Sequence, residues 1–266
     1  MILDLTHCIS PEMPVYPGTE QPILTTACTI REAGYRETIL HMYSHTGTHM
    51  DAPAHMIEGG RTLDAFPAET FAGPGFVLDC RGLREIPLSL LRAHEDEIRR
   101  ADFLLFCTGW DKRWGRAEYY EGFPCLTPEA AAFVATLPLK GIGEDCISID
   151  PCDSIDFPNH ITLLGAGLLN TENLKNLDQL LGSFEAENEF LAYIDENYTT
   201  EEAQALQTKI ESIPNVKQAI FVTREEALQE YKEGRADNSL LDQMPASALR
   251  DRYRIHVADI EQMSST

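Results

Sequence analysis

The first chemical feature of this sequence is a short segment that holds three histidines and one carboxylate, namely His45, His49, Asp51 and His55. All four positions are odd-numbered, so an extended chain, whose side chains alternate between two faces, would direct all four to the same side. A helix would pair His45 with His49 but would turn Asp51 about 200° away from His49. Gly47 and Pro53 also disfavour a helix. We therefore predict an extended segment that carries convergent metal ligands.

Two neutral imidazoles and a carboxylate suit zinc best, although manganese and iron also accept such ligands. Three protein ligands leave a position open for water, which is typical of a catalytic metal site. A divalent ion there would lower the pKa of bound water from about 15.7 towards roughly 7 and polarise a carbonyl oxygen. The segment thus predicts hydrolysis of an amide or ester, and His55 is our choice for the histidine that moves the proton. The alternative is four structural or surface side chains, but a single histidine fits that interpretation better than a convergent set.

The segment also resembles a known signature. The cyclase family, whose best-known member is kynurenine formamidase, has the pattern H-x-G-T-H-x-D-x-P-x-H, and residues 45–55 read H-T-G-T-H-M-D-A-P-A-H. The resemblance continues in short stretches on both sides of this segment, at residues 4–6, 13–18, 141–142, 148–150, 158–160, 163–164 and 172–174. It therefore covers about residues 1–183, which we expect to form a hydrolase domain.

The resemblance implies roles for individual residues. It implies that His45, His49 and Asp51 bind metal and that His55 is the catalytic acid and base. Further positions match the ligands that complete a second site in members with two zinc ions, with Asp51 as the bridge, and these are His160 and Glu172. Tyr16 stands where the formamidase signature tends to have tryptophan, in a substrate-stacking position. This departure keeps an aromatic lining but does not imply specificity for N-formylkynurenine.

Composition excludes several classes of function. The chain has 266 residues and a formal net charge of −22, which argues against binding to nucleic acid or to an anionic membrane surface. Seven cysteines without a C-x-x-C pair indicate reduced thiols, as in the cytoplasm, rather than a disulfide framework. The N-terminus lacks a basic region, and no apolar run approaches eighteen residues, so we expect neither a secretory signal nor a membrane span.

Apolar runs and capping signals predict the elements of the first part. Residues 76–80 and 103–107 are expected to be buried strands, and residues 66–75 a loop. We predict one helix over residues 88–100 and another that starts at Thr127-Pro128-Glu129. Trp110 and Trp114 could line a pocket, although core packing is the favoured interpretation.

The chain changes character after about residue 183. Only one of its 17 glycines, Gly234, lies beyond this point. We expect strands and helices to alternate there, with strands at 189–194, 216–222 and 253–257 and helices at 199–212 and 223–233. Capping boxes at Thr199-x-x-Glu202 and Thr223-x-x-Glu226 mark the two helix starts. This pattern predicts a small α+β sandwich over residues 184–266.

This second part resembles the extracellular domain of FtsX, a permease-like cell-division protein, at residues 190–195, 213–216, 221–227 and 249–254. In that family the domain lies between membrane helices and binds peptidoglycan-hydrolase partners. The FtsX-like stretch begins where a cyclase would continue to a closing strand of the D-G-S-P-V-R type, which this chain lacks. We therefore expect a chimera with an α/β fold in two parts. The first part is a cyclase-type swivelling β/β/α fold without its closing strand, and the second is the sandwich.

Two hypotheses of function follow. The first is a zinc- or manganese-dependent amidohydrolase that cleaves an arylformamide, such as N-formylkynurenine in tryptophan catabolism, or a related cyclic or linear amide. The resemblance also implies a homo-oligomer, and the cysteine usage indicates the cytoplasm. The second is a non-catalytic module that docks a protein partner through apolar residues such as Phe221, Leu240 and Leu241, with an inactive first part. Metal content combined with turnover distinguishes the two.

Overall fold

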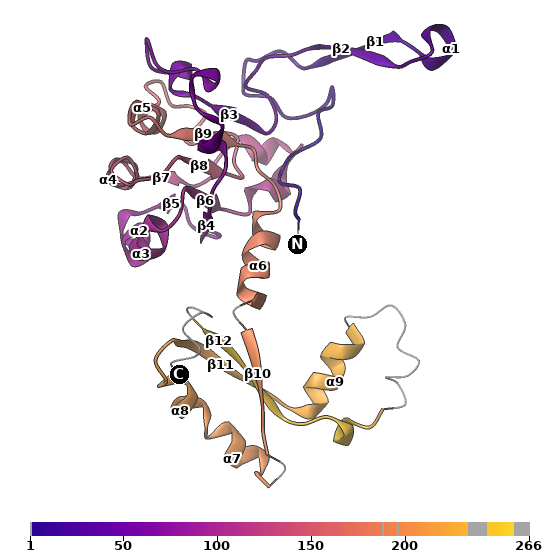
Figure 1. Ribbon diagram of the computed structural model, residues 1–266, viewed down its shortest axis with the longest axis vertical. Coiled ribbons are helices and arrows are strands. Elements are labelled where there is room, and N and C mark those ends of the chain that lie inside the picture. Colours follow the sequence, from indigo (N-terminus) through magenta and orange to yellow (C-terminus); the bar gives the residue numbers. More distant parts are fainter. Residues whose placement is uncertain (1, 188, 196, 234–243, 258–266) are drawn as a thin grey trace. The chain divides into compact units, whose positions relative to one another are not determined.

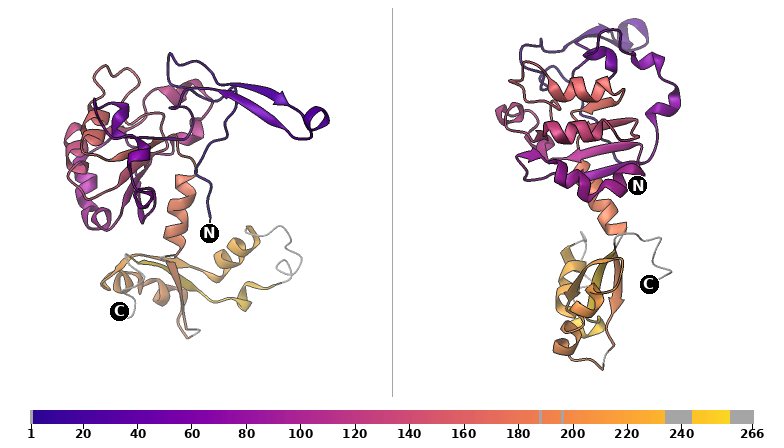
Figure 2. Two further views of the ribbon diagram at one scale, coloured as in Figure 1. Left: turned by 45° about the horizontal axis from the view of Figure 1, so that its top comes forward. Right: turned by 90° about the vertical axis from the view of Figure 1, so that its left-hand side faces the viewer.

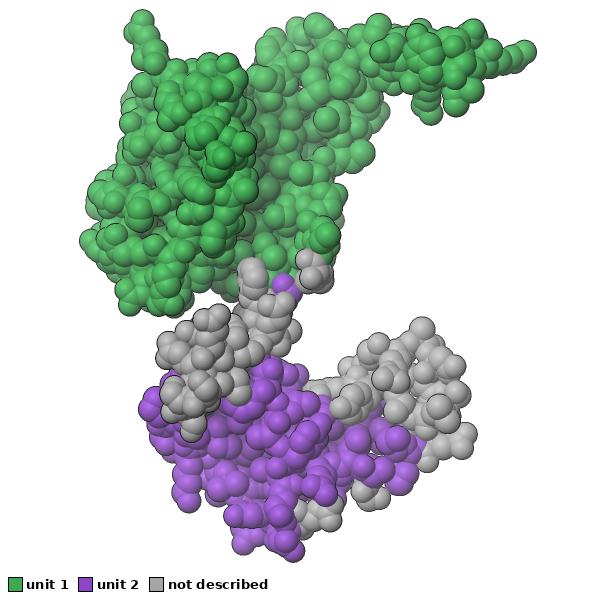
Figure 3. Space-filling model, in the orientation of Figure 1, with its two compact units in different colours: residues 1–181 green, residues 182–266 purple. Residues whose placement is uncertain are grey.

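The computed structural model of the chain describes residues 2–187, 189–195, 197–233 and 244–257. The chain divides into two compact units, residues 1–181 and residues 182–266 (Figure 3). Each unit has its own sheet and its own buried cluster. Within the described ranges, no helix combines the length and apolar character that a membrane span requires. All seven cysteines are unpaired, as predicted.

The first unit is built on a five-stranded sheet with the order β3-β9-β8-β6-β4. Its strands are β3 (His49–Asp51), β9 (Leu169–Glu172), β8 (Gly141–Glu144), β6 (Phe103–Cys107) and β4 (Gly75–Asp79). The four strands from β9 to β4 are parallel, whereas β3 runs antiparallel to β9. The predicted strands at 76–80 and 103–107 are therefore confirmed within one residue.

Helices cover one face of this sheet (Figures 1 and 2). They are α2 (Leu88–Ala93), α3 (Glu95–Arg99), α4 (Pro128–Val134) and α5 (Pro158–Gly165). The main core lies between the two layers, where Leu78, Leu104 and Ile142 of the strands pack with Leu91 and Leu163 of the helices. A smaller buried cluster that includes Val77, Cys107 and Leu174 lies apart from this main core. Burial on both faces is typical of parallel strands, and β4 and β6 accordingly read as nearly continuous apolar runs rather than alternating ones.

Two local predictions for the first unit need correction. The helix expected over residues 88–100 is two helices, because His94 adopts the non-helical dihedrals φ −118° and ψ 21° between them. The loop expected over residues 66–75 contains a turn of 3-10 helix at Ala68–Phe71. The start of α4 is as predicted, with Pro128 in its first turn and the Thr127 hydroxyl accepting a hydrogen bond from Ala130 N.

Short elements complete the first unit. A hairpin of β1 (Ile23–Cys28) and β2 (Glu37–His41) carries the helix α1 (Ile30–Ala33) at its tip, and β5 (Glu85–Ile86) pairs with β7 (Cys125–Leu126). The other 3-10 helices of this unit are η1 (Pro53–His55), η2 (Leu63–Ala65), η4 (Trp110–Arg113) and η5 (Ala117–Tyr120). Helix α6 (Leu177–Glu187) leads from the first unit into the second.

The second unit has a three-stranded antiparallel sheet with the order β10-β12-β11. Its elements are β10 (Glu189–Tyr193), α7 (Thr200–Gln204), α8 (Gln207–Glu211), β11 (Val216–Val222), α9 (Arg224–Glu233), the 3-10 helix η7 (Ala246–Ala248) and β12 (Arg252–Val257). The three predicted strands agree, but the helix expected over 199–212 is split into α7 and α8. Phe221 packs against the buried cluster around Tyr253, whereas Leu240 and Leu241 lie outside the described residues.

Candidate metal centre

The histidine-rich segment converges on one site, but not as a single extended chain. Only His49–Asp51 forms a strand, β3, which pairs with β9 so that His49 lies opposite Glu172. His45 precedes the strand in a bend, and His55 ends the 3-10 helix η1 that Pro53 begins. The prediction of an extended segment is therefore wrong outside β3, since Gly47 with φ 69° and Pro53 each turn the chain.

The glycine before β3 also orients the first imidazole. The Nδ1 atom of His49 lies 2.8 Å from the Gly47 carbonyl oxygen, which can only accept a hydrogen bond, so the ring proton belongs on Nδ1. The Nε2 lone pair of His49 is then free and lies 3.3 Å from Asp51 Oδ1 and 3.8 Å from Glu172 Oε2. This arrangement presents a neutral imidazole as a metal ligand.

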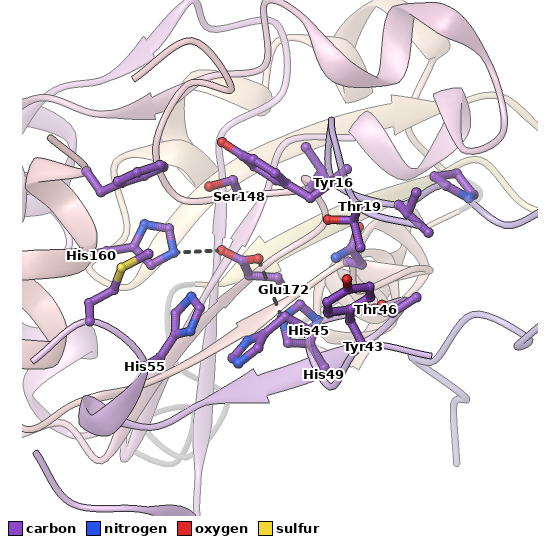
Figure 4. Close-up of a pocket in the computed structure, with 17 residues that line it drawn as sticks. Tyr16, Thr19, Tyr43, His45, Thr46, His49, His55, Ser148, His160 and Glu172 are labelled. Atoms are coloured by element: carbon purple, nitrogen blue, oxygen red, sulfur yellow. Dashed lines mark hydrogen bonds and ion pairs between the residues drawn. The ribbon is translucent and has the colours of Figure 1, made fainter. Parts of the chain in front are cut away.

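A second imidazole, from a distant part of the chain, is held in the same way. His160 lies in α5, and its Nδ1 atom is 2.8 Å from Asp150 Oδ2. Its Nε2 atom lies 3.1 Å from Glu172 Oε1 and 3.9 Å from Asp51 Oδ2. His49 and His160 therefore approach Glu172 from two sides (Figure 4). The structure thus places His160 and Glu172 beside the histidine-rich segment, as the resemblance implied.

Asp51 is the central carboxylate of the group. It is buried, and its two oxygens lie near His45, His49 and His160, with 2.5 Å between His45 Nδ1 and Asp51 Oδ1. Ligand atoms of His49, Asp51 and Glu172 lie within 4.8 Å of one another, and so do those of His45, Asp51 and His55. Asp51 belongs to both groups, which is the position that a bridging ligand requires.

The charges of the group depend on one another. Burial disfavours a charged His160, but its hydrogen bonds to Asp150 and Glu172 outweigh burial and raise the pKa to about 10. Burial opposes the charge of His49 as well, yet Asp51 and Glu172 raise its pKa. The pKa of Asp51 is lowered because its contacts with the His45 and His49 imidazoles outweigh its burial. The carboxylates therefore stabilise positive charge at this point, which protonated imidazoles or a divalent cation can supply.

Two buried atoms of the group lack a hydrogen-bond partner among the described residues. These are His49 Nε2 and Asp51 Oδ2. An unpaired buried polar atom costs about 1–3 kcal/mol, so natural proteins rarely tolerate it without a reason. Both atoms are electron-pair donors that face the shared space of the cluster, and imidazole nitrogen with carboxylate oxygen is a donor set that zinc accepts. The residues present therefore fit a divalent metal ion.

His55 lies at the edge of the group. Its ring stacks on that of His45, with 3.8 Å between ring centroids and 25° between planes. Burial lowers the pKa of His55, which favours the neutral imidazole at neutral pH. A neutral imidazole beside the reaction site can accept a proton, which is the role predicted for His55.

The group opens into a pocket of about 230 Å³. The predicted stacking residue Tyr16 lines it, with its hydroxyl donating to the Cys152 carbonyl oxygen at 3.3 Å, and Tyr43 and Phe157 add two further aromatic rings. Phe157 directly precedes α5 and has φ 43°, a left-handed conformation that is unusual for a bulky residue. Trp110 and Trp114 instead pack with Tyr119 and Phe123, so the core interpretation of the two tryptophans is the correct one.

Reasoning from the sequence missed several polar residues around the site. Asp150 belongs to a stretch that matches the family signature but was assigned no role, although it holds His160 and two backbone N–H groups of α5. Asn170 donates from Nδ2 to Glu172 Oε1 and to Glu144 Oε1, at 3.2 and 3.3 Å. Asn170 and Glu172 are two positions apart on β9 and so lie on the same face of the strand, which the sequence could have indicated. The contact with Glu144 depends on strand pairing.

Comparisons with known proteins identify relatives of both parts of the chain. Residues 3–151 match the Cyclase family model, described as "Putative cyclase". Kynurenine formamidase of Salinibacter ruber is 30% identical over 181 residues, which cover 65% of this chain and 82% of that protein. Kynurenine formamidase of Geobacillus thermodenitrificans is 27% identical over 179 residues. Residues 187–266 match the model of the FtsX extracellular domain, so two different family models match consecutive parts of the chain.

Solved structures resemble the first unit. Isatin hydrolase A from Labrenzia aggregata, bound to benzyl benzoate, has 30% sequence identity and a TM-score of 0.59, covering 66% of this chain and 81% of that chain. A structure titled "predicted metal-dependent hydrolase" from Bacillus stearothermophilus has 32% identity and a TM-score of 0.54, covering 65% of this chain and 82% of its own. The family match and the relatives lead to one conclusion: this chain belongs to the cyclase family.

Proposed function

We propose that the first unit is a metal-dependent hydrolase that cleaves the C–N bond of an aryl amide, either an arylformamide or a cyclic amide. The observation that carries this proposal is the convergence of His49, Asp51, His160 and Glu172, with unpaired donor atoms on His49 and Asp51. The names of the relatives support it, because a formamidase and an isatin hydrolase both open amide bonds.

His45, His49, Asp51, His160 and Glu172 would hold one or two divalent ions, zinc by preference. Such an ion supplies Lewis acidity and lowers the pKa of a water molecule. The protein's part is orientation, since Gly47 and Asp150 keep the protons of His49 and His160 on Nδ1 and so leave their Nε2 atoms as ligands.

His55 is the proposed acid and base. Its neutral ring, stacked on His45 and open to the pocket, would accept the proton of the attacking water and then deliver it to the leaving amine nitrogen. Tyr16, Tyr43 and Phe157 would contact the aromatic ring attached to that nitrogen. Apolar walls around a few polar groups are typical of a small-molecule site.

The test is metal analysis combined with turnover. The purified full chain should bind zinc in a stoichiometric amount and hydrolyse formanilide or isatin, and Asp51→Asn should lose both properties. A chain that binds zinc but hydrolyses neither an arylformamide nor a lactam would contradict the proposal.

The match of residues 187–266 to the FtsX extracellular domain favours a second candidate function. In it, the second unit binds a protein partner and the first unit is inactive because its sheet lacks the closing strand expected of a cyclase. The two candidates differ in outcome: a chain that contains little metal and is inert towards amides favours the binding module.

A further inference from the structure

Asn173 occupies an unusual position beside the proposed ligand Glu172. It has φ 57°, a left-handed conformation, and only 4% of its surface is exposed. Successive side chains of a strand alternate between faces, but this φ breaks the alternation at the end of β9. As a result, Glu172 and Asn173 both line the same pocket.

Hydrogen bonds hold the backbone of Asn173 on both sides. Its N–H donates to the Cys146 carbonyl oxygen at 2.9 Å, and its carbonyl oxygen accepts from the Thr48 hydroxyl at 2.5 Å. Thr48 belongs to the histidine-rich segment, so this contact ties the end of β9 to that segment. The position of Asn173 relative to the metal ligands is therefore determined by the fold.

The side-chain amide is oriented by a buried phenol. The Tyr119 hydroxyl donates to Asn173 Oδ1 at 2.8 Å, and Tyr119 is fully buried. Burial raises the pKa of Tyr119, so the phenol keeps its proton and remains a donor. With Oδ1 turned towards Tyr119, the Nδ2 group is turned away from it, and Nδ2 makes no hydrogen bond to any described residue.

We propose that Asn173 binds the substrate by donating a hydrogen bond from Nδ2 to the carbonyl oxygen of the amide. This inference rests on the proposed hydrolase function of the same pocket. A neutral amide donor suits this task because it keeps its hydrogens at every working pH and does not compete for the metal. Its place next to Glu172 brings it to the reacting end of the pocket, where negative charge develops on that oxygen.

Two substitutions test the donor without changing the backbone. Asn173→Gly keeps a residue that accepts a positive φ but removes the amide. Asn173→Asp keeps the shape and the acceptor for Tyr119 but replaces the N–H donor with a carboxylate oxygen. Tyr119→Phe is the matched control, because it leaves the amide in place and removes only the group that orients it.

The measurements are formanilide hydrolysis and calorimetric binding of 2-oxindole, a stable lactam, by the zinc-loaded full chain. Removing a donor to a developing oxyanion lowers kcat by about 10²–10³-fold. We expect a loss in kcat of this size for both Asn173 variants. The Kd for 2-oxindole should rise by about two- to tenfold, the effect of one lost neutral hydrogen bond. Tyr119→Phe should show a smaller loss than Asn173→Gly. Zinc content should remain stoichiometric throughout.

Clear outcomes would overturn the inference. If either Asn173 variant folds, holds zinc and retains kcat within about threefold of the wild type, the amide does not bind the reacting oxygen. A larger loss in Tyr119→Phe than in Asn173→Gly would show that packing around Tyr119, and not the amide, matters. Failure of the proposed function is distinguishable, because then the wild-type chain itself would not hydrolyse formanilide.

Discussion

The carboxylate of Asp150 holds His160 at two points, accepting hydrogen bonds from its backbone N at 3.0 Å and from its Nδ1 at 2.8 Å. The other oxygen of Asp150 accepts from Asn159 N at 3.0 Å. One buried side chain therefore satisfies the start of α5 and orients a proposed ligand carried by that helix. The stability of the helix and the geometry of the metal centre depend on the same group.

Asp150→Asn should weaken metal binding more than it changes the fold. An amide offers one acceptor oxygen in place of two, so either Asn159 N or both the backbone N and the ring Nδ1 of His160 lose their acceptor. Loss of such a supporting partner costs about 10–100-fold in metal affinity. Competition of the protein with a zinc-binding dye measures this change. Asp156→Asn, on the exposed stretch before α5, is the control and should bind zinc as the wild type does.

His55→Ala should abolish turnover while zinc content stays unchanged. Loss of an acid–base group lowers kcat by about 10²–10⁴-fold. Formanilide hydrolysis and elemental analysis of the same samples provide the two measurements. Loss of zinc in this variant would instead make His55 a ligand, which its place within the group of His45 and Asp51 makes a real alternative outcome. His41→Ala, on the exposed strand β2, serves as the control.

Zinc should stabilise the first unit against heat. An ion that binds only the folded state adds about 2.7 kcal/mol at a free concentration 100 times its Kd. The Tm of the wild type should therefore rise on addition of zinc and fall on addition of a chelator. Asp51→Asn should show neither shift, because Asp51 contributes to both groups of ligand atoms. Equal shifts in the two proteins would place the ion elsewhere.

The stability of the first unit should depend on pH through Asp145. Burial raises the pKa of Asp145 to about 6, although Thr108 and Gly109 donate hydrogen bonds to it. The unfolded value is 3.8, so the folded chain binds the extra proton between these two values. The proton on Asp145 therefore adds to the free energy of unfolding. This stabilisation is present in full below pH 3.8 and is lost as the pH rises through about 6. A shift of this size corresponds to about 3 kcal/mol.

Urea unfolding of the wild type and of Asp145→Asn between pH 4 and pH 7 measures this effect. The difference in the free energy of unfolding between the two proteins should change over that window, since asparagine does not titrate. A constant difference would show that Asp145 is ionised in the folded chain throughout.

The second unit should respond to loss of a helix cap without affecting the metal centre. The Thr199 hydroxyl accepts from Glu202 N at 3.2 Å, while Glu202 Oε2 accepts from Thr199 N at 2.9 Å, and both contacts form the predicted capping box. Thr199→Ala should destabilise the second unit by about 1 kcal/mol, whereas Thr199→Ser should be nearly neutral. Unfolding curves measure the stability of each variant, and titration with zinc measures its affinity for the ion. A change in zinc affinity would contradict the expectation that the cap does not affect the metal centre.

The sequence was sufficient for those features that depend on nearby residues. The capping box at Thr199 and the proline that opens α4 involve residues within three positions of one another, and both are confirmed. The buried strands β4 and β6 were predictable because an apolar run between polar ends suits only the interior. The cyclase signature lies within residues 45–55, so the order of the amino acids alone is enough to recognise it.

Tertiary structure decided how these pieces meet. His160 and Glu172 reach Asp51 because β3 pairs with β9 and α5 packs beside that strand, a relationship between residues more than a hundred positions apart. The turn at Asn173 is likewise held by contacts from Thr48 and Tyr119, which are distant in the sequence. Local patterns predict the type of an element and the chemistry of its side chains. The directions of those side chains, and hence the site, follow from long-range packing, which places most polar groups that are taken out of water beside a partner.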